Sequence, residues 1–139
     1  MLRGQTSSYE SEAGQKMSVS ENILTAAAGL INGCVGGRAE AEIPVITLSE
    51  YSESERFFDG GRLFSMKLAL RRICGDDARQ TYSQLCGEAE MIEKMPSDEG
   101  LLFFFVRSDK PVFTGFSEDG REIYRADIYI EAAQRGDLP

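Results

Sequence analysis

Acidic side chains are the residues of this chain best suited to chemistry. Glu88, Glu90 and Glu93 lie on the polar side of a predicted helix, and Asp76 and Asp77 stand just before it. Carboxylates grouped in this way can hold a divalent cation. A solvated helix face accounts for the glutamates and helix capping accounts for the aspartates, so we predict structural roles and no metal site.

Nucleophilic and phosphate-binding motifs are missing from the sequence. The chain has no histidine, which removes the commonest general base and excludes a Ser-His-Asp or Cys-His site. Cys34, Cys74 and Cys86 form no CxxC pair, and we predict that they are buried free thiols in a reducing compartment. The glycine-rich residues 33–37 follow a helix and lack a GK[ST] ending, which indicates a helix stop. We therefore predict neither an enzyme nor a bound cofactor.

Composition indicates one soluble globular domain. The chain has 139 residues, 42% of them hydrophobic and 27% charged. Its net charge of −8 disfavours broad binding to a phosphate backbone, because a polyanion is repelled at long range. No apolar run has the length needed to span a bilayer, and the N-terminal residues lack the apolar centre of a secretory signal. We expect a protein of the cytoplasm, or of something assembled there.

The first half of the chain predicts an arm, a helix and a strand. Residues 1–17 are polar and predict a flexible arm. Ser18 and Glu21 have capping-box spacing and open a helix predicted over 20–32. The β-branched residues of 42–48 predict a strand, with Pro44 at an edge or strand start. Residues 49–61 are polar and acidic, and we predict a loop there.

The second half predicts a strand, a helix and three more strands. Residues 62–73 alternate like a half-buried strand, and a helix follows from Asp76 or Asp77 until Pro96 ends it. The apolar run 101–106 predicts a central strand buried on both faces. The closing hairpin turns at 117–120. A single domain over 18–133 and a polar tail over 134–139 complete the prediction.

This order of elements defines the expected fold. Helices separated by antiparallel strands are typical of an α+β domain. We expect two helices packed on one face of a mixed or antiparallel sheet of about four to five strands.

The C-terminal half also resembles a family. The strand RLFSMKLALRR leading into DDARQTYSQLCGEAEMIEKM, and the closing FFFVRSDKPVFTGFSEDGREIYRADIYIEA, resemble the tail-terminator and minor capsid (head–tail joining) proteins of long-tailed bacteriophages. The resemblance covers 20–132. It is carried most clearly by Pro111, Phe113, Gly115, Asp119, Gly120, Arg121, Tyr124 and Ile128.

The resemblance implies a structural protein of the virion tail or neck, assembled in the host cytoplasm. Such proteins form a homo-oligomeric ring, usually of six copies, that caps the tail tube protein and meets head-completion or connector proteins. DNA would pass through the lumen without specific binding, and no membrane is involved. The residues that we select as candidates for protein interfaces are Phe57, Phe58, Tyr51, Glu118, Asp119 and Arg121.

Two alternatives remain at this point. The first is a small acidic protein-binding module of a bacterial cell, such as a secretion chaperone or an immunity-type protein. The second is an enzyme that uses carboxylates and a metal.

Overall fold

The chain forms two helices and a six-stranded mixed sheet in the computed structural model, which describes residues 18–36, 43–97 and 100–136. The predicted N-terminal arm, residues 1–17, lies outside the described residues. The elements in chain order are α1 (Val19–Ile31), β1 (Cys34–Val35), β2 (Val45–Arg56), β3 (Arg62–Ile73), α2 (Ala78–Glu93), β4 (Leu101–Ser108), β5 (Val112–Phe116) and β6 (Glu122–Gln134).

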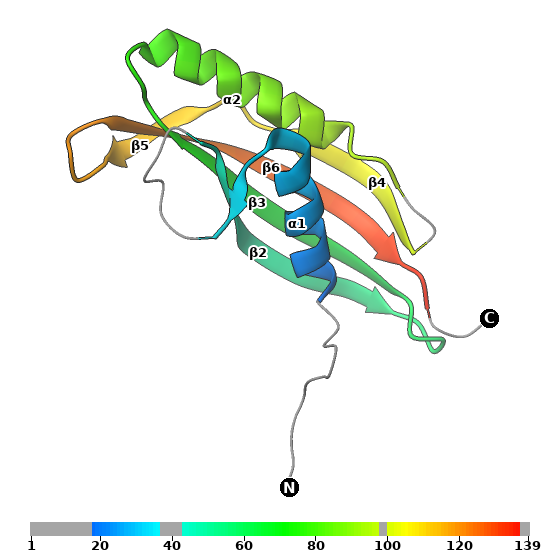
Figure 1. The fold of residues 1–139 in the computed structure, drawn as a ribbon. Coiled ribbons are helices and arrows are strands. Elements are labelled where there is room, and N and C mark those ends of the chain that lie inside the picture. The colour runs from blue at the N-terminus through cyan, green and yellow to red at the C-terminus, as the bar shows by residue number, and fades with distance from the viewer. Residues whose placement is uncertain (1–17, 37–42, 98–99, 137–139) are drawn as a thin grey trace, which may run out of the picture.

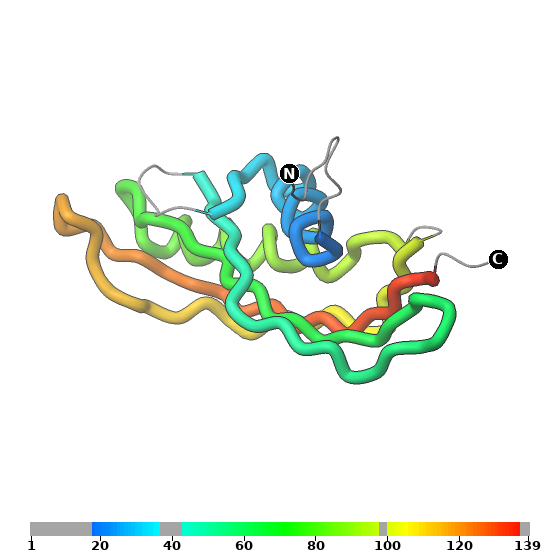
Figure 2. Tube along the Cα trace, turned by 90° about the horizontal axis from the view of Figure 1, so that it is seen from below, coloured from blue at the N-terminus to red at the C-terminus, as the bar shows by residue number. Residues whose placement is uncertain are grey.

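The sheet has the strand order β1-β2-β3-β6-β4, and β5 pairs with β6 beyond the end of β4. Only the β1–β2 pair is parallel. Both helices cover the same face of the sheet, and the opposite face is bare in the described part of the chain (Figures 1 and 2). The α+β prediction is confirmed, with six strands in place of four to five.

The core lies between the helices and the two central strands. Alternate residues of β3 and β6 point at the helices because successive side chains of a strand face opposite ways. The residues that meet there from the sheet are Phe64, Met66, Leu68, Leu70, Ala126, Ile128, Ile130 and Ala132, and those from the helices include Ile23, Leu24, Ala27, Leu85, Ala89 and Ile92.

The capping box predicted for α1 is confirmed. The Glu21 N–H donates to Ser18 Oγ at 3.2 Å, and the Ser18 N–H donates to the Glu21 carboxylate at 2.9 Å. The bonds with Ser18 lower the pKa of Glu21. In α2, Asp77 is the cap, and its carboxylate accepts from the Arg79 N–H.

The loop predicted for 49–61 is wrong. Residues 49–56 are the second half of β2, and they pair with β3 as far as Arg56 and Arg62. Serine and glutamate are poor strand formers, but pairing with a strong neighbour overrides that preference. Only Phe57 to Gly61 turn, where the Phe57 N–H donates to the Gly61 carbonyl at 2.8 Å.

The buried central strand predicted for 101–106 is also wrong. In the described part of the chain, β4 pairs with β6 alone, so it is an edge strand. Phe103 and Val106 pack against the core, but Leu102, Phe104 and Phe105 are exposed. A continuous apolar run does not reveal whether the fold itself covers its second face.

The predicted turn of the closing hairpin is confirmed, and the β2–β3 turn has the same form. Gly60 and Gly120 take φ values of +91° and +85°, and each donates its N–H to a carbonyl three residues earlier at 3.0 Å. An Asp-Gly pair supplies this geometry in both turns, because glycine enters the left-handed region without steric cost.

Candidate protein-interaction surfaces

Five of the six candidate interface residues chosen from the sequence fall at two separate turns. Phe57 and Phe58 lie at the β2–β3 turn, where Phe58 is fully exposed. Glu118, Asp119 and Arg121 lie at the β5–β6 turn. The two turns are at opposite ends of the sheet, so these residues do not form one site (Figure 1).

Tyr51 lies apart from both turns. It is half-buried, and its ring stacks on Phe64 with 5.6 Å between centroids. Its hydroxyl is buried and has no hydrogen-bond partner among the described residues. The side chain therefore extends the core under β2.

The β5–β6 turn is held by its own polar side chains. Asp119 accepts a short hydrogen bond from the Ser117 hydroxyl and another from Arg121 Nε at 2.9 Å. The hydrogen bond from Ser117 lowers the pKa of Asp119, and the Arg121 guanidinium lowers it further. Partial desolvation acts in the opposite direction. These contacts fix the shape of the turn from within.

The largest group of exposed apolar side chains lies on β4 and β5, which run end to end along β6. We call this the apolar border. Phe104 is 59% exposed and Phe116 is 65% exposed. Six of the twelve large exposed apolar residues in the described chain belong to it, namely Leu102, Phe104, Phe105, Val112, Phe113 and Phe116. Sequence reasoning missed this surface, because the same run predicted a buried strand.

Side chains cap the backbone of β4 at two points. The Phe103 N–H donates to Ser97 Oγ at 2.9 Å. The Ser108 N–H and its hydroxyl both donate to the Glu93 carboxylate of α2 at 2.7 Å. Such caps protect an edge strand from indiscriminate strand pairing. The side chains of the apolar border are therefore more available than its β4 backbone.

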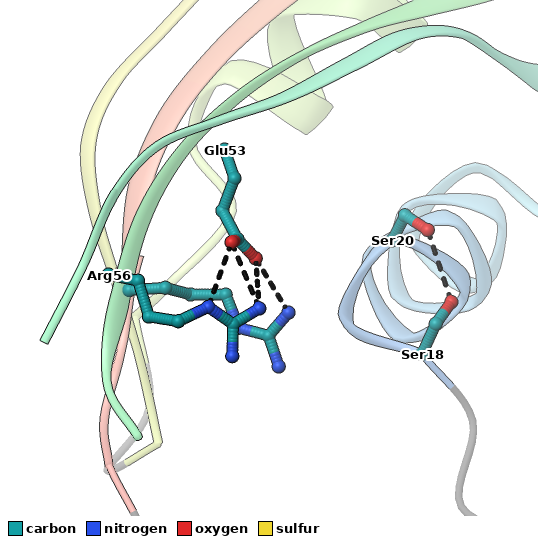
Figure 3. A network of polar contacts seen from close by, with 5 residues as sticks. Ser18, Ser20, Glu53 and Arg56 are labelled. Carbon is teal, nitrogen blue, oxygen red and sulfur yellow. Dashed lines mark hydrogen bonds and ion pairs between the residues drawn. The ribbon is translucent and has the colours of Figure 1, made fainter. Parts of the chain in front are cut away.

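The opposite margin of the sheet is β2, and its chemistry is different. We call its stretch from Thr47 to Arg56 the acidic border, after Glu50, Glu53 and Glu55. Glu53 accepts from the guanidinium groups of Arg56 and Arg62 at 2.9 Å (Figure 3, with the Ser18–Ser20 pair at the start of α1 in the same view). Desolvation alone would raise the pKa of Glu53, but the bonds to Arg62 and Arg56 outweigh it and lower this pKa.

The bare face of the sheet carries a mixed array of charges. Tyr129 lies below Arg107, 4.5 Å from guanidinium carbon to ring centroid, and near the ammonium of Lys67. Arg107 also pairs with Asp109 at 2.6 Å, which lowers the pKa of Asp109. A hydrogen bond to Asp109, with partial desolvation, raises the pKa of Tyr129. Opposite charges balance within this array, so it forms no strong anion or cation site.

The helix glutamates are structural, though not all are solvated as predicted. Glu88 forms a largely buried ion pair with Arg72, 2.7 Å from Nη2 to Oε2. Arg72, near the end of β3, is therefore also largely buried. Glu93 caps Ser108, and Glu90 is exposed. Within 18–36, 43–97 and 100–136, no three His, Cys, Asp or Glu residues are grouped to hold a metal.

The cysteines have three different environments. All are free; Cys74 is buried, Cys86 is half-buried and Cys34 is exposed on β1. The prediction of burial is therefore wrong for Cys34, because β1 forms a short margin strand that the sequence did not indicate. Among the described residues, neither helix has the length and apolar character to cross a membrane.

These surfaces define an α+β domain with one bare sheet face and two unlike margins. No protein-family model and no curated protein matches the chain. The surfaces themselves therefore carry the evidence for a function.

Proposed function

We propose that the chain is a structural assembly subunit that binds copies of itself through the margins of its sheet. In its specific form, the proposal is a tail-terminator or head–tail joining subunit of a long-tailed bacteriophage. A ring of such subunits, six by analogy with the family, would cap the tail tube and connect it to the head.

The apolar border is the observation that carries this proposal. A soluble monomer seldom exposes half of its large exposed apolar side chains along one margin of its sheet, and concentrated apolar surface of this kind marks protein interfaces. Fully burying a leucine or phenylalanine contributes about 1.5–3 kcal/mol. Covering six half-exposed side chains would thus contribute about 5–9 kcal/mol, which is comparable to the entropic cost of association.

Two further features support the virion role. The exposed turns at opposite ends of the sheet suit a subunit that meets different neighbours on two sides, here the tail tube and the head connector (Figure 1). The net charge of −8 suits a channel that DNA must cross without adhering. The sequence resemblance supplies the family.

Native mass spectrometry of the purified full chain, with tail tubes from the same source added in a second experiment, tests the proposal. We expect a closed oligomer, and binding to the ends of the tubes in electron micrographs. A monomer at micromolar concentration that ignores the tubes would refute it.

The apolar border also fits a secretion chaperone, which would use it to hold an apolar segment of a client. Such a protein is expected to be a dimer. The number of copies in the purified oligomer therefore separates the two functions.

A further inference from the structure

We propose that neighbouring copies meet head to tail, with the acidic border of one copy against the apolar border of the next. This inference depends on the proposed function, because it names the contact through which the assembly would form. Each copy would contribute its acidic border to the contact with one neighbour and its apolar border to the contact with the other.

The backbone of the acidic border is open. β1 pairs only with Val45 and Ile46, and the Gly36 N–H donates to the Ile46 carbonyl at 2.9 Å. Among the described residues, no strand pairs with the outer edge of β2 from Thr47 onward. An unpaired edge of this length is a template for another strand. β2 therefore supplies hydrogen-bonding groups that the capped β4 strand does not.

Contact between two acidic borders is unfavourable. The Glu50 side chain is 73% exposed and Glu55 is also exposed, so a twofold contact would bring like charges together. Like charges opposite each other destabilise a strand pair. The net charge of −8 per chain adds to the repulsion.

Contact between two apolar borders leaves hydrogen bonds unmade. The N–H groups of Phe103 and Ser108 are already used by Ser97 and Glu93, so two β4 strands cannot exchange a full ladder. Such a contact would also bring the cations Arg107 and Lys110 close to their own copies.

The two unlike borders complement each other. The exposed Lys110 lies at the junction of β4 and β5, next to the Arg107–Asp109 ion pair, where it can face a carboxylate of the acidic border. Across the sheet, the open stretch of β2 is level with β4, because Ser52, Ser65, Glu131 and Phe105 pair in succession. Leu48, exposed near the start of the acidic border, adds apolar area against the phenylalanines.

Strand direction agrees with this contact. Each step from β2 through β3 and β6 to β4 is antiparallel, so β2 and β4 run in opposite directions. A neighbour brought alongside by rotation about a ring axis then places its β4 and β5 antiparallel to β2. All helices then lie on one side of the assembly, and a head-to-tail contact of this kind can close into a ring.

Mixing two defective variants tests the inference. Glu50→Lys/Glu55→Lys alters the acidic border, and Leu102→Asp/Phe105→Asp alters the apolar border; all four positions are exposed. Native mass spectrometry should show each variant alone as a monomer. An equimolar mixture should form complexes with equal numbers of the two variants, because their intact margins still fit each other and their altered margins carry opposite charges.

A twofold contact of apolar borders gives the opposite pattern. The Glu50→Lys/Glu55→Lys variant would then associate with itself, and mixing would add nothing. That result overturns the head-to-tail contact but leaves the proposed assembly role intact. Failure of the unaltered chain to associate at all would instead refute the proposed function.

Crosslinking provides a check that needs no lysine variants. In a Cys34→Ser background, Ser52→Cys lies on the acidic border and Phe105→Cys lies at the same level on β4, both exposed. With a mild copper oxidant, the mixture of the two should yield a crosslinked dimer at least tenfold more abundant than either protein alone. Equal or greater crosslinking within one variant would overturn the inference.

Discussion

The Arg72–Glu88 ion pair is expected to be a major link between β3 and α2. Arg72 Nη2 lies 2.7 Å from one carboxylate oxygen of Glu88, and Nε lies 3.0 and 3.2 Å from the two oxygens. Both side chains are only 12% exposed. Replacing Glu88 by glutamine keeps the shape of the side chain but leaves the guanidinium charge without its partner.

Breaking a buried pair in this way costs about 3–5 kcal/mol, because the remaining charge stays desolvated. The residual exposure of both side chains places the expected loss at the lower end, about 3 kcal/mol. For a domain of this size, the melting temperature should fall by about 10 °C. Replacing both residues by methionine should recover most of that loss, since no uncompensated charge then remains.

Urea unfolding of Arg72→Met, Glu88→Met and Arg72→Met/Glu88→Met measures the pair as a double-mutant cycle, and Glu88→Gln is measured beside them. Glu90→Gln is the matched control, because Glu90 is exposed on the same helix, and its effect should stay within about 0.5 kcal/mol. A loss below about 1 kcal/mol for Glu88→Gln would refute the reasoning, since surface ion pairs contribute that little.

Three further predictions concern local contacts. Gly120→Ala should destabilise the fold by about 1–2 kcal/mol in urea unfolding because its φ is +85°, whereas Gly87→Ala, inside α2 with open space around it, should stabilise it by about 0.5–1 kcal/mol. If Gly120→Ala and Gly87→Ala changed the free energy of unfolding equally, the left-handed geometry of Gly120 would be contradicted. Glu93→Ala should cost about 1–3 kcal/mol and accelerate hydrogen exchange at the Ser108 amide, with Glu90→Ala as the unaffected control. The lowered pKa of Glu21 means that its stabilisation is present above the ordinary glutamate pKa and is lost as pH falls through the lowered value. Urea midpoints between pH 7 and 3 should therefore fall less steeply for Glu21→Gln and for Ser18→Ala; an unchanged slope would exclude the capping box as an acid-labile contact.

The sequence predicted those parts of the fold that local patterns control. The capping box at Ser18, the alternation along β3 and the Asp-Gly turn of the closing hairpin each depend on neighbouring residues, so their spacing was sufficient. The Arg72–Glu88 pair was not predictable, because the two residues meet only after β3 and α2 pack together.

The interaction surfaces were predicted less well for a different physical reason. The outer half of β2 is polar on both faces because no helix covers it, and this composition is also typical of a loop. The strand β4 is apolar on both faces, although the domain covers only one of them. Hydrophobic periodicity reports which side chains avoid water, but not whether the covering surface belongs to the same chain.

The two margins of the sheet can be understood together from this difference. Caps from Ser97 and Glu93 stabilise two backbone donors of β4, yet they leave its phenylalanines uncovered. If the exposed apolar side chains of this margin had no function, the backbone beside them would not need caps. Capping the backbone while leaving the side chains exposed restricts contact to a partner of complementary shape. The acidic border is the other margin of the same chain, and its exposed glutamates, with Leu48, can meet Lys110 and the exposed side chains of the apolar border.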